Sequence, residues 1–452
     1  MIIKRLKWVG LGSGTLVGLV LWIALMGLVS GSQHASAWAE AQPSGTPTGS
    51  IAYVTEDGRQ IRLVEPDGSN DRLVWQTPAN TVYGISSVAW RPDAAQLAFT
   101  SGHEALCSLW HSDVYVINPD GSGLRRVTNA PACAQLGGNP TGDVTVRIEN
   151  YINNTNQFLV YFEGMTTAYP LTLEPGFAVD VTFYGVGDLG PGVLQQPVVI
   201  NASQRWMNPA VYADVVAGST VNIASPLQIS ANGTYEQWGA SAAAWSPDQT
   251  QIGFILGVGA LWRTPVNPPI LSTGQNLLDP AVSVLANNLA WHPTTNQILY
   301  EEYGSFPSGI NLATVGGATP GTRLVDTTLT SGISWLPDGS GFLYTDHNAL
   351  LSESNIYYYD LGNRAAAGGD VTQITFFTNE FAGAPAASPD MSEIVFTRGS
   401  QYGGGPPLAV QIINSNGSNL RSLANGGGGS TWSHHDVPAS SGYALYIPAV
   451  SR

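Results

Sequence analysis

The sequence has few charged residues and almost no lysine. Only 11% of its 452 residues are charged, and no lysine follows Lys7. A Schiff-base or lysine-nucleophile mechanism is therefore excluded from the rest of the chain. The chain also has no Gly-x-Ser-x-Gly elbow, which argues against an attached α/β-hydrolase, and it has no CxxC, HExxH or P-loop motif.

Glycine, proline and aromatic residues are frequent instead. The chain has 52 glycines and 29 prolines, aromatics reach 10%, and 43% of all residues are hydrophobic. This composition is typical of many short strands joined by turns, and the length allows about two or three domains. We expect an all-β protein.

Residues 1–39 have the features of an export signal. Lys4, Arg5 and Lys7 precede an apolar run over residues 8–29, and the small-residue site Ala37-Trp38-Ala39 follows. Cleavage after Ala39 would leave Glu40 as the new N-terminus. The apolar run is also long enough to span a bilayer, so an uncleaved signal anchor is the alternative. In both cases the rest of the chain is exported, to the periplasm, the cell surface or the extracellular space.

The mature chain is strongly acidic. Residues 40–49 are rich in proline, serine, glycine and threonine, which predicts a flexible leader. Of the 17 basic residues, three lie in the signal, so 14 remain against 32 acidic residues and the net charge becomes −18. Such a charge repels phosphate backbones, so we expect no nucleic-acid partner. A membrane contact is expected only if the signal is an uncleaved anchor.

A short unit recurs along the chain. Trp245-Ser-Pro-Asp248 is followed by the apolar run 251–255, which predicts a strand, a turn and a second strand. Six copies occur, with their first residues at Trp90, Trp245, Trp291, Trp335, Ala387 and Trp432. The intervals between them are 155, 46, 44, 52 and 45 residues. A period near 45 with four strand signals per copy predicts propeller blades, and the first interval is long enough to hold an inserted domain.

The repeat resembles that of TolB-type six-bladed propellers, also described as WD40-like Pro-Asp repeats. The shared features are an aromatic residue, Ser-Pro-Asp, an apolar strand, and a later strand that ends in Asp-Gly-Ser, as in Pro119-Asp-Gly-Ser122. The resemblance covers residues 50–133 and 239–435 and implies a six-bladed propeller. The α/β domain that precedes the propeller in TolB has no counterpart that we recognise here.

The two ends of the repeat region are complementary. Residues 51–75 supply three strand signals without a first strand, and the run at Ser430-Thr-Trp432 is a first strand without its own blade. We therefore expect the C-terminal strand to complete the N-terminal blade and close the ring. Residues 436–452 form a C-terminal tail, in which residues 444–447 have the pattern of a spare strand.

Residues 134–238 have a different pattern. Alternating apolar runs at 144–148, 158–162, 171–173 and 179–183, separated by turns, predict an inserted β-sandwich-like domain. In a four-stranded meander the loop between strands two and three lies at the same end as the exit from strand four. Cys107 and Cys133 occupy these two places, so a disulfide is geometrically sensible; the alternative is two buried free thiols. The bond would contribute roughly 3 kcal/mol.

The long loops between the second and third strands lie at the same end as the insertion and carry the candidate binding residues. These loops combine aromatic, acidic and a few basic side chains, a mixture that can bind a sugar or a peptide. Each residue can also be an ordinary polar loop residue. The candidates are His103, Glu104, Trp110, Tyr303, Phe306, Asp346, His347, Arg398 and Tyr402.

The other repeated residues are better explained by structure. The tryptophans can be read as sugar-stacking platforms, but their fixed place at the end of each first strand favours packing between blades. The aspartates after proline are interpreted as turn formers. His434 and His435, with Asp436, are the nearest approach to a metal cluster, but they replace the Pro-Asp of a repeat turn. We expect no metal, no cofactor and no catalytic residue.

The sequence therefore favours an exported, non-catalytic binding or scaffold protein whose propeller contacts a protein or a glycan. One alternative is an extracellular enzyme that acts on saccharides or peptides in the mouth of the propeller. Another is a structural component of the cell surface, which retention of the N-terminal segment would favour.

Overall fold

A computed structural model describes the chain from residue 49 to residue 433, with gaps at 80, 82, 106–107, 109, 129–139, 154–155, 166, 189–193, 202–203, 209, 231–238, 258, 268–273, 305–306, 363–369, 401–407 and 426–428. The expected signal, both cysteines, Phe306, Tyr402, the histidine pair 434–435 and the C-terminal tail lie outside the described residues. All the elements assigned between these limits are strands. No helix in the described residues is long and apolar enough to cross a bilayer.

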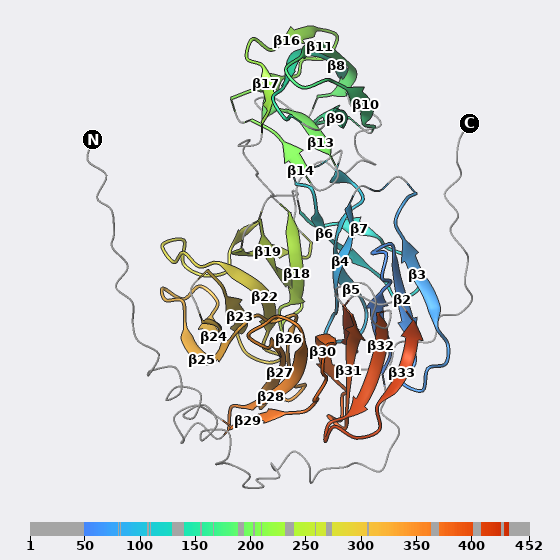
Figure 1. Ribbon diagram of the computed structural model, residues 1–452, viewed down its shortest axis with the longest axis vertical. Coiled ribbons are helices and arrows are strands. Elements are labelled where there is room, and N and C mark those ends of the chain that lie inside the picture. The colour runs from blue at the N-terminus through green and yellow to red at the C-terminus, as the bar shows by residue number, and fades with distance from the viewer. Residues whose placement is uncertain are drawn as a thin grey trace, which may run out of the picture. The chain divides into compact units, whose positions relative to one another are not determined.

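Six four-stranded antiparallel sheets form the blades of a propeller (Figure 1), which confirms the predicted fold class. Each blade contains one repeat, with the strand that precedes the Pro-Asp turn innermost. The first three blades along the chain are blade 1, β34 (Ser430–Trp432), β1 (Ile51–Val54), β2 (Gln60–Val64) and β3 (Arg72–Gln76); blade 2, β4 (Tyr83–Trp90), β5 (Leu97–Gly102), β6 (Asp113–Ile117) and β7 (Arg125–Arg126); and blade 3, β18 (Ala240–Trp245), β19 (Gln251–Leu256), β20 (Ala260–Pro265) and β21 (Gln275–Asn276).

The other three blades follow without interruption. They are blade 4, β22 (Ala286–Trp291), β23 (Gln297–Glu302), β24 (Ser308–Thr314) and β25 (Thr322–Thr327); blade 5, β26 (Ile333–Trp335), β27 (Gly341–His347), β28 (Ser354–Asp360) and β29 (Asp370–Gln373); and blade 6, β30 (Phe381–Ala387), β31 (Glu393–Gly399), β32 (Ala409–Asn414) and β33 (Arg421–Asn425). We call the end with the Pro-Asp turns the turn end, and the end with the loops between second and third strands the loop end.

The ring is closed within blade 1, as the sequence predicts. β34 pairs antiparallel with β1, with Ile51 opposite Trp432 and Tyr53 opposite Ser430. Beyond these pairs the Ser50 amide donates to Ser433 Oγ over 2.8 Å, and the Ser433 amide donates to the Ser50 carbonyl over 3.0 Å. The pairing leaves no open strand edge at the join.

The repeated tryptophans pack between blades, as expected. Each one belongs to a hydrophobic cluster that includes side chains of the preceding blade. Trp245 Nε1 also donates to the Ala89 carbonyl of blade 2 over 3.2 Å, and Trp335 Nε1 donates to the Ala290 carbonyl of blade 4 over 3.3 Å. These indoles therefore fix the distance between neighbouring blades as well as burying apolar area.

The turns between third and fourth strands approach the preceding blade very closely. Gly121 and Gly417 have φ angles of 84° and 81°. A Cβ atom at Gly121 would lie 2.6 Å from the Val74 carbonyl oxygen, and one at Gly417 would lie 2.6 Å from that of Ile374. Glycine is needed at both positions because of the left-handed backbone and because of the lack of space.

The insertion leaves blade 2 after β7 and returns before β18. Its two main sheets have the orders β10-β9-β13-β14 and β11-β8-β16, with β17 also paired to β8, while β12 and β15 form a separate pair. Its strands are β8 (Thr141–Asn150), β9 (Gln157–Phe162), β10 (Tyr169–Thr172), β11 (Ala178–Gly187), β12 (Leu194–Gln195), β13 (Pro197–Asn201), β14 (Gln204–Trp206), β15 (Ala213–Asp214), β16 (Thr220–Asn222) and β17 (Leu227–Ile229).

The inner faces of these two sheets enclose one hydrophobic core. Val144, Val146 and Ile148 of β8 contribute to it from one sheet, and Phe158 and Val160 of β9 contribute from the other. The opposite face of β9 carries Tyr161, which is buried and donates from its hydroxyl to the Ala105 carbonyl of the propeller over 3.2 Å. The insertion is thus a sandwich that touches the loop between β5 and β6.

Ring closure predicts a large effect of changing Trp432. The side chain is 2% exposed and packs against blade 6, so Trp432→Ala removes a full aromatic contact and leaves a cavity at the join. We expect the free energy of unfolding to fall by about 3–5 kcal/mol in equilibrium urea titrations. Leu420→Ala, at a side chain that is 40% exposed, is the control and should change it by less than about 0.5 kcal/mol. Equal effects of the two changes would contradict this account of the join.

Candidate functional site

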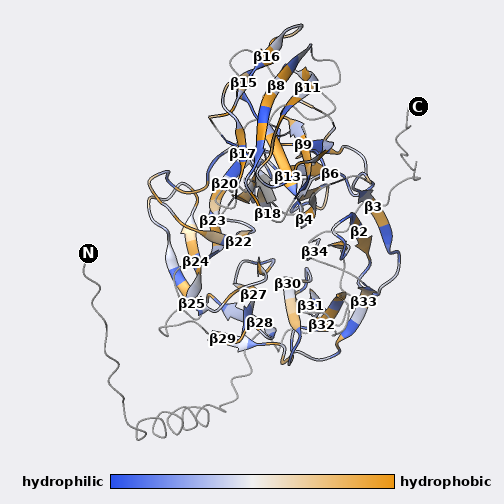
Figure 2. Cartoon of the chain, turned by 45° about the horizontal axis from the view of Figure 1, so that its top comes forward, coloured by the Kyte–Doolittle hydropathy of each residue, from blue (hydrophilic) through white to orange (hydrophobic). Residues whose placement is uncertain are grey.

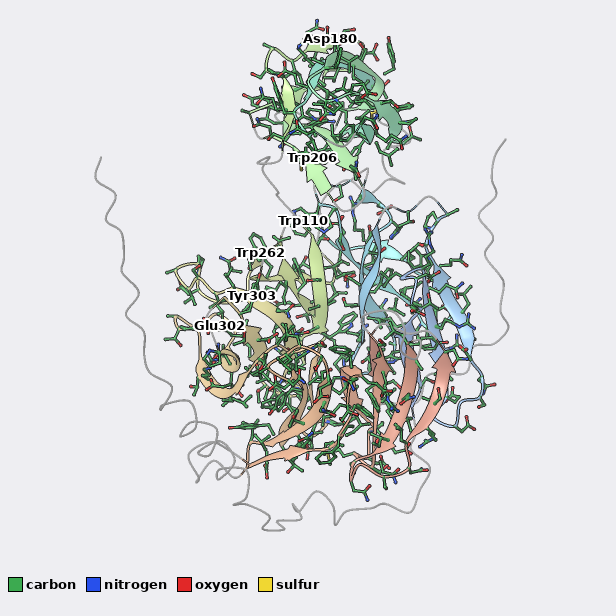
Figure 3. The ribbon with its side chains drawn as sticks, viewed as in Figure 1. Trp110, Asp180, Trp206, Trp262, Glu302 and Tyr303 are labelled. Atoms are coloured by element: carbon green, nitrogen blue, oxygen red, sulfur yellow. The ribbon has the colours of Figure 1, made fainter. Side chains whose placement is uncertain are left out.

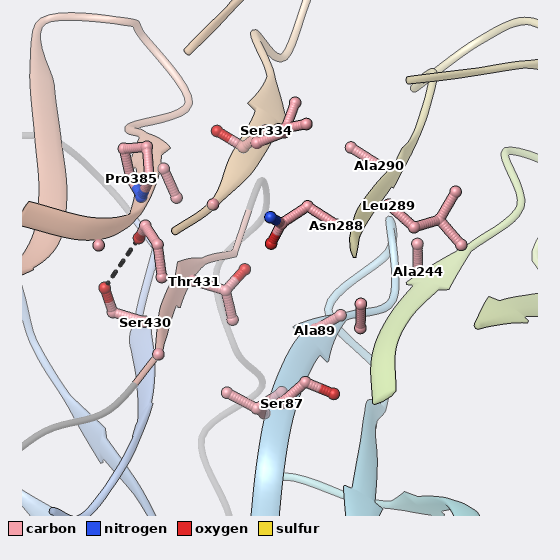
Figure 4. A pocket seen from close by; sticks show the side chains of 18 of the residues that line it. Ser87, Ala89, Ala244, Asn288, Leu289, Ala290, Ser334, Pro385, Ser430 and Thr431 are labelled. Carbon is pink, nitrogen blue, oxygen red and sulfur yellow. Dashed lines mark hydrogen bonds between the residues drawn. The ribbon is translucent and has the colours of Figure 1, made fainter. Parts of the chain in front are cut away.

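A channel of about 910 Å³ runs along the inner strands of the ring. Its wall comes from β4, β18, β22, β26, β30 and β34, and Figure 2 shows all of these except β26, which it does not label, around the centre of the ring. Small neutral side chains dominate the wall, among them Ser87, Ala244, Asn288 and Thr431 (Figure 4). The charged lining residues are Glu56, in the loop that follows β1, and Arg91, at the turn end. The described wall is therefore polar but almost uncharged.

Several inner strands are irregular where they face the channel. The pairing register shifts between Ser241 and Ala244 in β18, between Ala286 and Leu289 in β22, and between Gly383 and Ala386 in β30. Ala242 and Ala384 have φ angles of 51° and 46°, an unfavourable conformation for alanine. These bulges interrupt the straight strand edge along the channel.

The most highly organised part of the wall lies between blades 4 and 5. Glu301 of β23 is fully buried and accepts the Thr330 amide and the Thr330 hydroxyl, both over 2.8 Å. Its Oε2 also accepts Nδ2 of Asn287 over 3.1 Å and Nδ2 of Asn288 over 3.3 Å. Both asparagines line the channel, and these hydrogen bonds use only their amide nitrogens, not their amide oxygens.

Ser331 and His347 form the neighbouring part of the wall. Ser331 Oγ lies 2.8 Å from His347 Nε2, and Phe381 packs on the imidazole with ring centroids 5.3 Å apart. His347 is 5% exposed, and burial lowers its pKa, so the ring is neutral. Its Nδ1 is buried and has no hydrogen-bond partner among the residues that the structure describes.

This burial decides which imidazole nitrogen carries the proton. A buried N–H group without an acceptor is costlier than a buried lone pair without a donor. The proton therefore resides on Nε2, which donates to Ser331 Oγ. The imidazole cannot then act as a base toward Ser331, and the serine hydroxyl is left to donate its own hydrogen into the channel.

Asp346 precedes His347 and faces the loop end. Its Oδ1 accepts the Thr328 amide over 2.8 Å and the Leu329 amide over 3.4 Å. Burial raises the pKa of its carboxyl from near 3.8 to about 6, against the effect of these amide hydrogen bonds. Asp346 and His347 are adjacent in β27 but contact different groups.

The candidates of blade 2 are engaged in internal packing. His103 lies between Trp75 and Tyr115, with ring centroids 4.7 and 4.3 Å away, and burial lowers its pKa to about 3. Glu104 lies 3.5 Å from Arg126 and accepts the Tyr115 hydroxyl over 3.3 Å. Trp110 is 4% exposed and packs on Phe254 within the core between blades 2 and 3.

Arg398 and Tyr303 lie on later blades. The Arg398 guanidinium is 2.5 Å from Glu380 and 4.2 Å above the Phe377 ring, so it braces the segment that links blades 5 and 6. Tyr303 is half-buried, its amide donates to the Leu285 carbonyl, and it lies on a different blade from Trp110 (Figure 3). The structure thus places Tyr303 on blade 4, Asp346 and His347 on blade 5 and Arg398 on blade 6, and the other described candidates lie on blade 2.

The channel wall was not singled out by the sequence. The residue after the aromatic side chain of the second strand is Thr100, Thr345 and Thr397 in three blades, but it is Glu301 in blade 4. A comparison of the repeats position by position would have revealed this departure. Among the described residues, no three His, Cys, Asp or Glu side chains lie close enough together to hold a metal ion.

No family model and no curated protein sequence matches this chain. It is similar to the crystal structure of TolB from Acinetobacter baumannii, with 14% identity, 86% of this chain and 67% of that chain covered, and a TM-score of 0.48. A structure of TolB from Agrobacterium tumefaciens has 19% identity over 42% of this chain and 84% of its own, with a TM-score of 0.30. A chain of a nidogen/laminin complex has 8% identity over 85% and 98%, with a TM-score of 0.47. At these identities the likeness concerns the fold alone.

Asp346 predicts a pH dependence of stability. Its pKa is higher in the folded than in the unfolded chain, so its contribution to stability is complete below about pH 4 and is lost as the pH rises through about 6. Asp346→Asn should therefore unfold with a free energy higher by roughly 1–2 kcal/mol at neutral pH, after allowance for solvent screening. Urea titrations at about pH 4 and pH 7 measure this difference. The exposed Asp180→Asn is the control; the same shift in both proteins would contradict the prediction.

Proposed function

We propose that this chain is an exported, non-catalytic binding or scaffold protein that holds a protein partner at the loop end of its propeller. Export is supported by the basic flank, the apolar run and the small-residue site in residues 1–39. A scaffold role is supported by the closed ring, whose loops project from a rigid frame.

The observation that carries the proposal is an exposed apolar patch on blade 5. Leu350 is 85% exposed and Phe376 is 75% exposed, and Leu351 is also exposed. These three residues, which we call the blade 5 patch, come from the loop between β27 and β28 and from the segment after β29. The two segments lie side by side, because the Asn379 amide donates to Glu353 Oε2 over 3.1 Å and the Ser354 amide donates to the Glu380 carbonyl over 3.0 Å.

The loop that carries the two leucines is held in one conformation. The Leu351 amide donates to the Asn348 carbonyl over 2.9 Å, and Asn348 Nδ2 donates to Ser352 Oγ over 2.9 Å. Leu351 has a φ angle of 53°, which is unfavourable for a leucine and is maintained by these contacts. A fixed loop loses little conformational entropy on binding, and exposed leucine and phenylalanine side chains suit an apolar patch on a protein partner.

The enzyme alternative has less support. The pair that most resembles a nucleophile and its base is Ser331 and His347. Because Nε2 of His347 donates to Ser331 Oγ, it cannot accept the proton of the serine hydroxyl and so does not activate it. His103 and Trp110, which the alternative would place in the mouth, are committed to packing between blades.

The blade 5 patch predicts a loss of binding in a double variant. Leu350→Glu with Phe376→Glu places two charges where apolar contact is required, so the affinity for a partner should fall at least tenfold. Immobilised chain is exposed to surface proteins of the source cells, a captured protein is purified, and its affinity is measured by titration. Leu420→Glu, at an exposed leucine of the turn end, is the matched control. Equal affinity of the double variant and the control would contradict the proposal, as would product release from a panel of saccharides and peptides without any capture.

Export with cleavage predicts the native N-terminus. If residues 1–39 are removed, the mass of the protein recovered from its natural compartment corresponds to a chain that begins at Glu40. Retention of the apolar run in that mass, together with membrane association, would favour the anchored structural component instead.

A further inference from the structure

We infer that the channel wall between blades 4 and 5 is a binding site for a neutral saccharide of one or two sugar units. The site consists of Asn287, Asn288 and Ser331, with Glu301 and His347 behind them. It is separate from the blade 5 patch and does not depend on a protein partner.

The first argument is that the hydrogen-bonding groups of this wall have fixed directions. Asn287 and Asn288 line the channel and donate their amide nitrogens to Glu301, so their amide oxygens can accept a hydrogen bond from a ligand. Asn288 Nδ2 is held further by Thr330 Oγ1 over 2.8 Å. His347 Nε2 occupies one lone pair of Ser331 Oγ, so the serine hydroxyl is a donor. Two acceptors on blade 4 and one donor on blade 5 therefore face the same space. A sugar hydroxyl can donate to an asparagine oxygen and accept from the Ser331 hydroxyl.

The second argument is the absence of charge at this place. Arg91 lies at the turn end and is paired with Asp93 and Gln249, with distances of 3.3 and 2.9 Å. Glu301 is completely covered by its own hydrogen-bond donors. An ionic ligand would find no charged side chain of the described wall beside Ser331, and it would lose its hydration without compensation. A neutral ligand avoids this cost.

The third argument concerns the shape of the wall. Leu289 and Ala290 of β22 and Ala244 of β18 provide small apolar surface beside the polar groups, as the carbon face of a sugar ring requires (Figure 4). A peptide that binds by strand addition would need a continuous strand edge, and the bulges in β18, β22 and β30 interrupt it. The channel volume of about 910 Å³ is ample for one or two sugar units.

The test compares two serines of the same blade. Both serines line the channel, but Ser331 is exposed, whereas the Oγ atom of Ser334 is itself buried and so cannot reach a ligand. Glucose, N-acetylglucosamine, maltose and cellobiose are titrated into the full chain by calorimetry, and neutral tetrapeptides are titrated in parallel. We expect at least one sugar to bind, Ser331→Ala to weaken it about tenfold, and Asn287→Ala to weaken it similarly. Ser334→Ala should bind as the unchanged protein does.

Three results would overturn the inference. One is that none of the sugars binds at millimolar concentration. A second is that Ser334→Ala weakens binding as much as Ser331→Ala does. A third is that the tetrapeptides bind in the channel and the sugars do not. The Leu350→Glu and Phe376→Glu double variant should retain full sugar affinity, so failure of the blade 5 patch as a docking site and failure of this channel site are distinguishable.

Discussion

The packing of each blade against its neighbour is the constraint on which the structure depends. A single four-stranded meander has two faces and can bury them only against adjacent blades. The tryptophan at the end of each inner strand meets this need, because its ring packs on the preceding blade and, in Trp245 and Trp335, its N–H binds the carbonyl there. Blade 6 has Ala387 at this position, so no repeat tryptophan packs between blades 5 and 6, whereas Trp432 of blade 1 packs on blade 6 as the other tryptophans pack on their preceding blades. This packing holds the inner strands at a fixed distance from the axis. It therefore also fixes the positions of the side chains that line the channel.

The sequence predicts the repeated part of the fold well, because the repeat is local. Tryptophan, Pro-Asp and the alternating strand lie within about ten residues, and turn chemistry and periodicity act over that range. Ring closure was predictable as well, since three strand signals at one end and a single one at the other are complementary. The insertion was predictable only as a sandwich, because the parallel pairing of β16 and β17 with β8 depends on contacts distant in sequence.

The candidate site was much less predictable, for a physical reason. A loop sequence shows which side chains are polar. It does not show which of them already form hydrogen bonds or ion pairs with neighbouring residues. His103 and Glu104 are neutralised or paired by residues of other strands, and Arg398 is bound to Glu380. In contrast, Asn288 and Ser331 have unremarkable sequence surroundings. Their directions are set by Glu301 and His347, and only the packing of blades 4 and 5 brings these groups together.

The join in blade 1 has a mechanical consequence. β1 begins beside the residue at which β34 ends, since Ile51 is opposite Trp432. A pulling force applied through the leader and the tail would therefore separate one residue pair at a time. β34 and β1 form three such pairs, and Ser50 and Ser433 are hydrogen-bonded beyond them. Each of the other five blades is a continuous stretch of chain. The force would not act on them until β34 had separated from β1. Under tension the ring should open at blade 1 while the remaining blades stay folded. The mechanical resistance of the ring is therefore lowest at the place where the chain enters and leaves it.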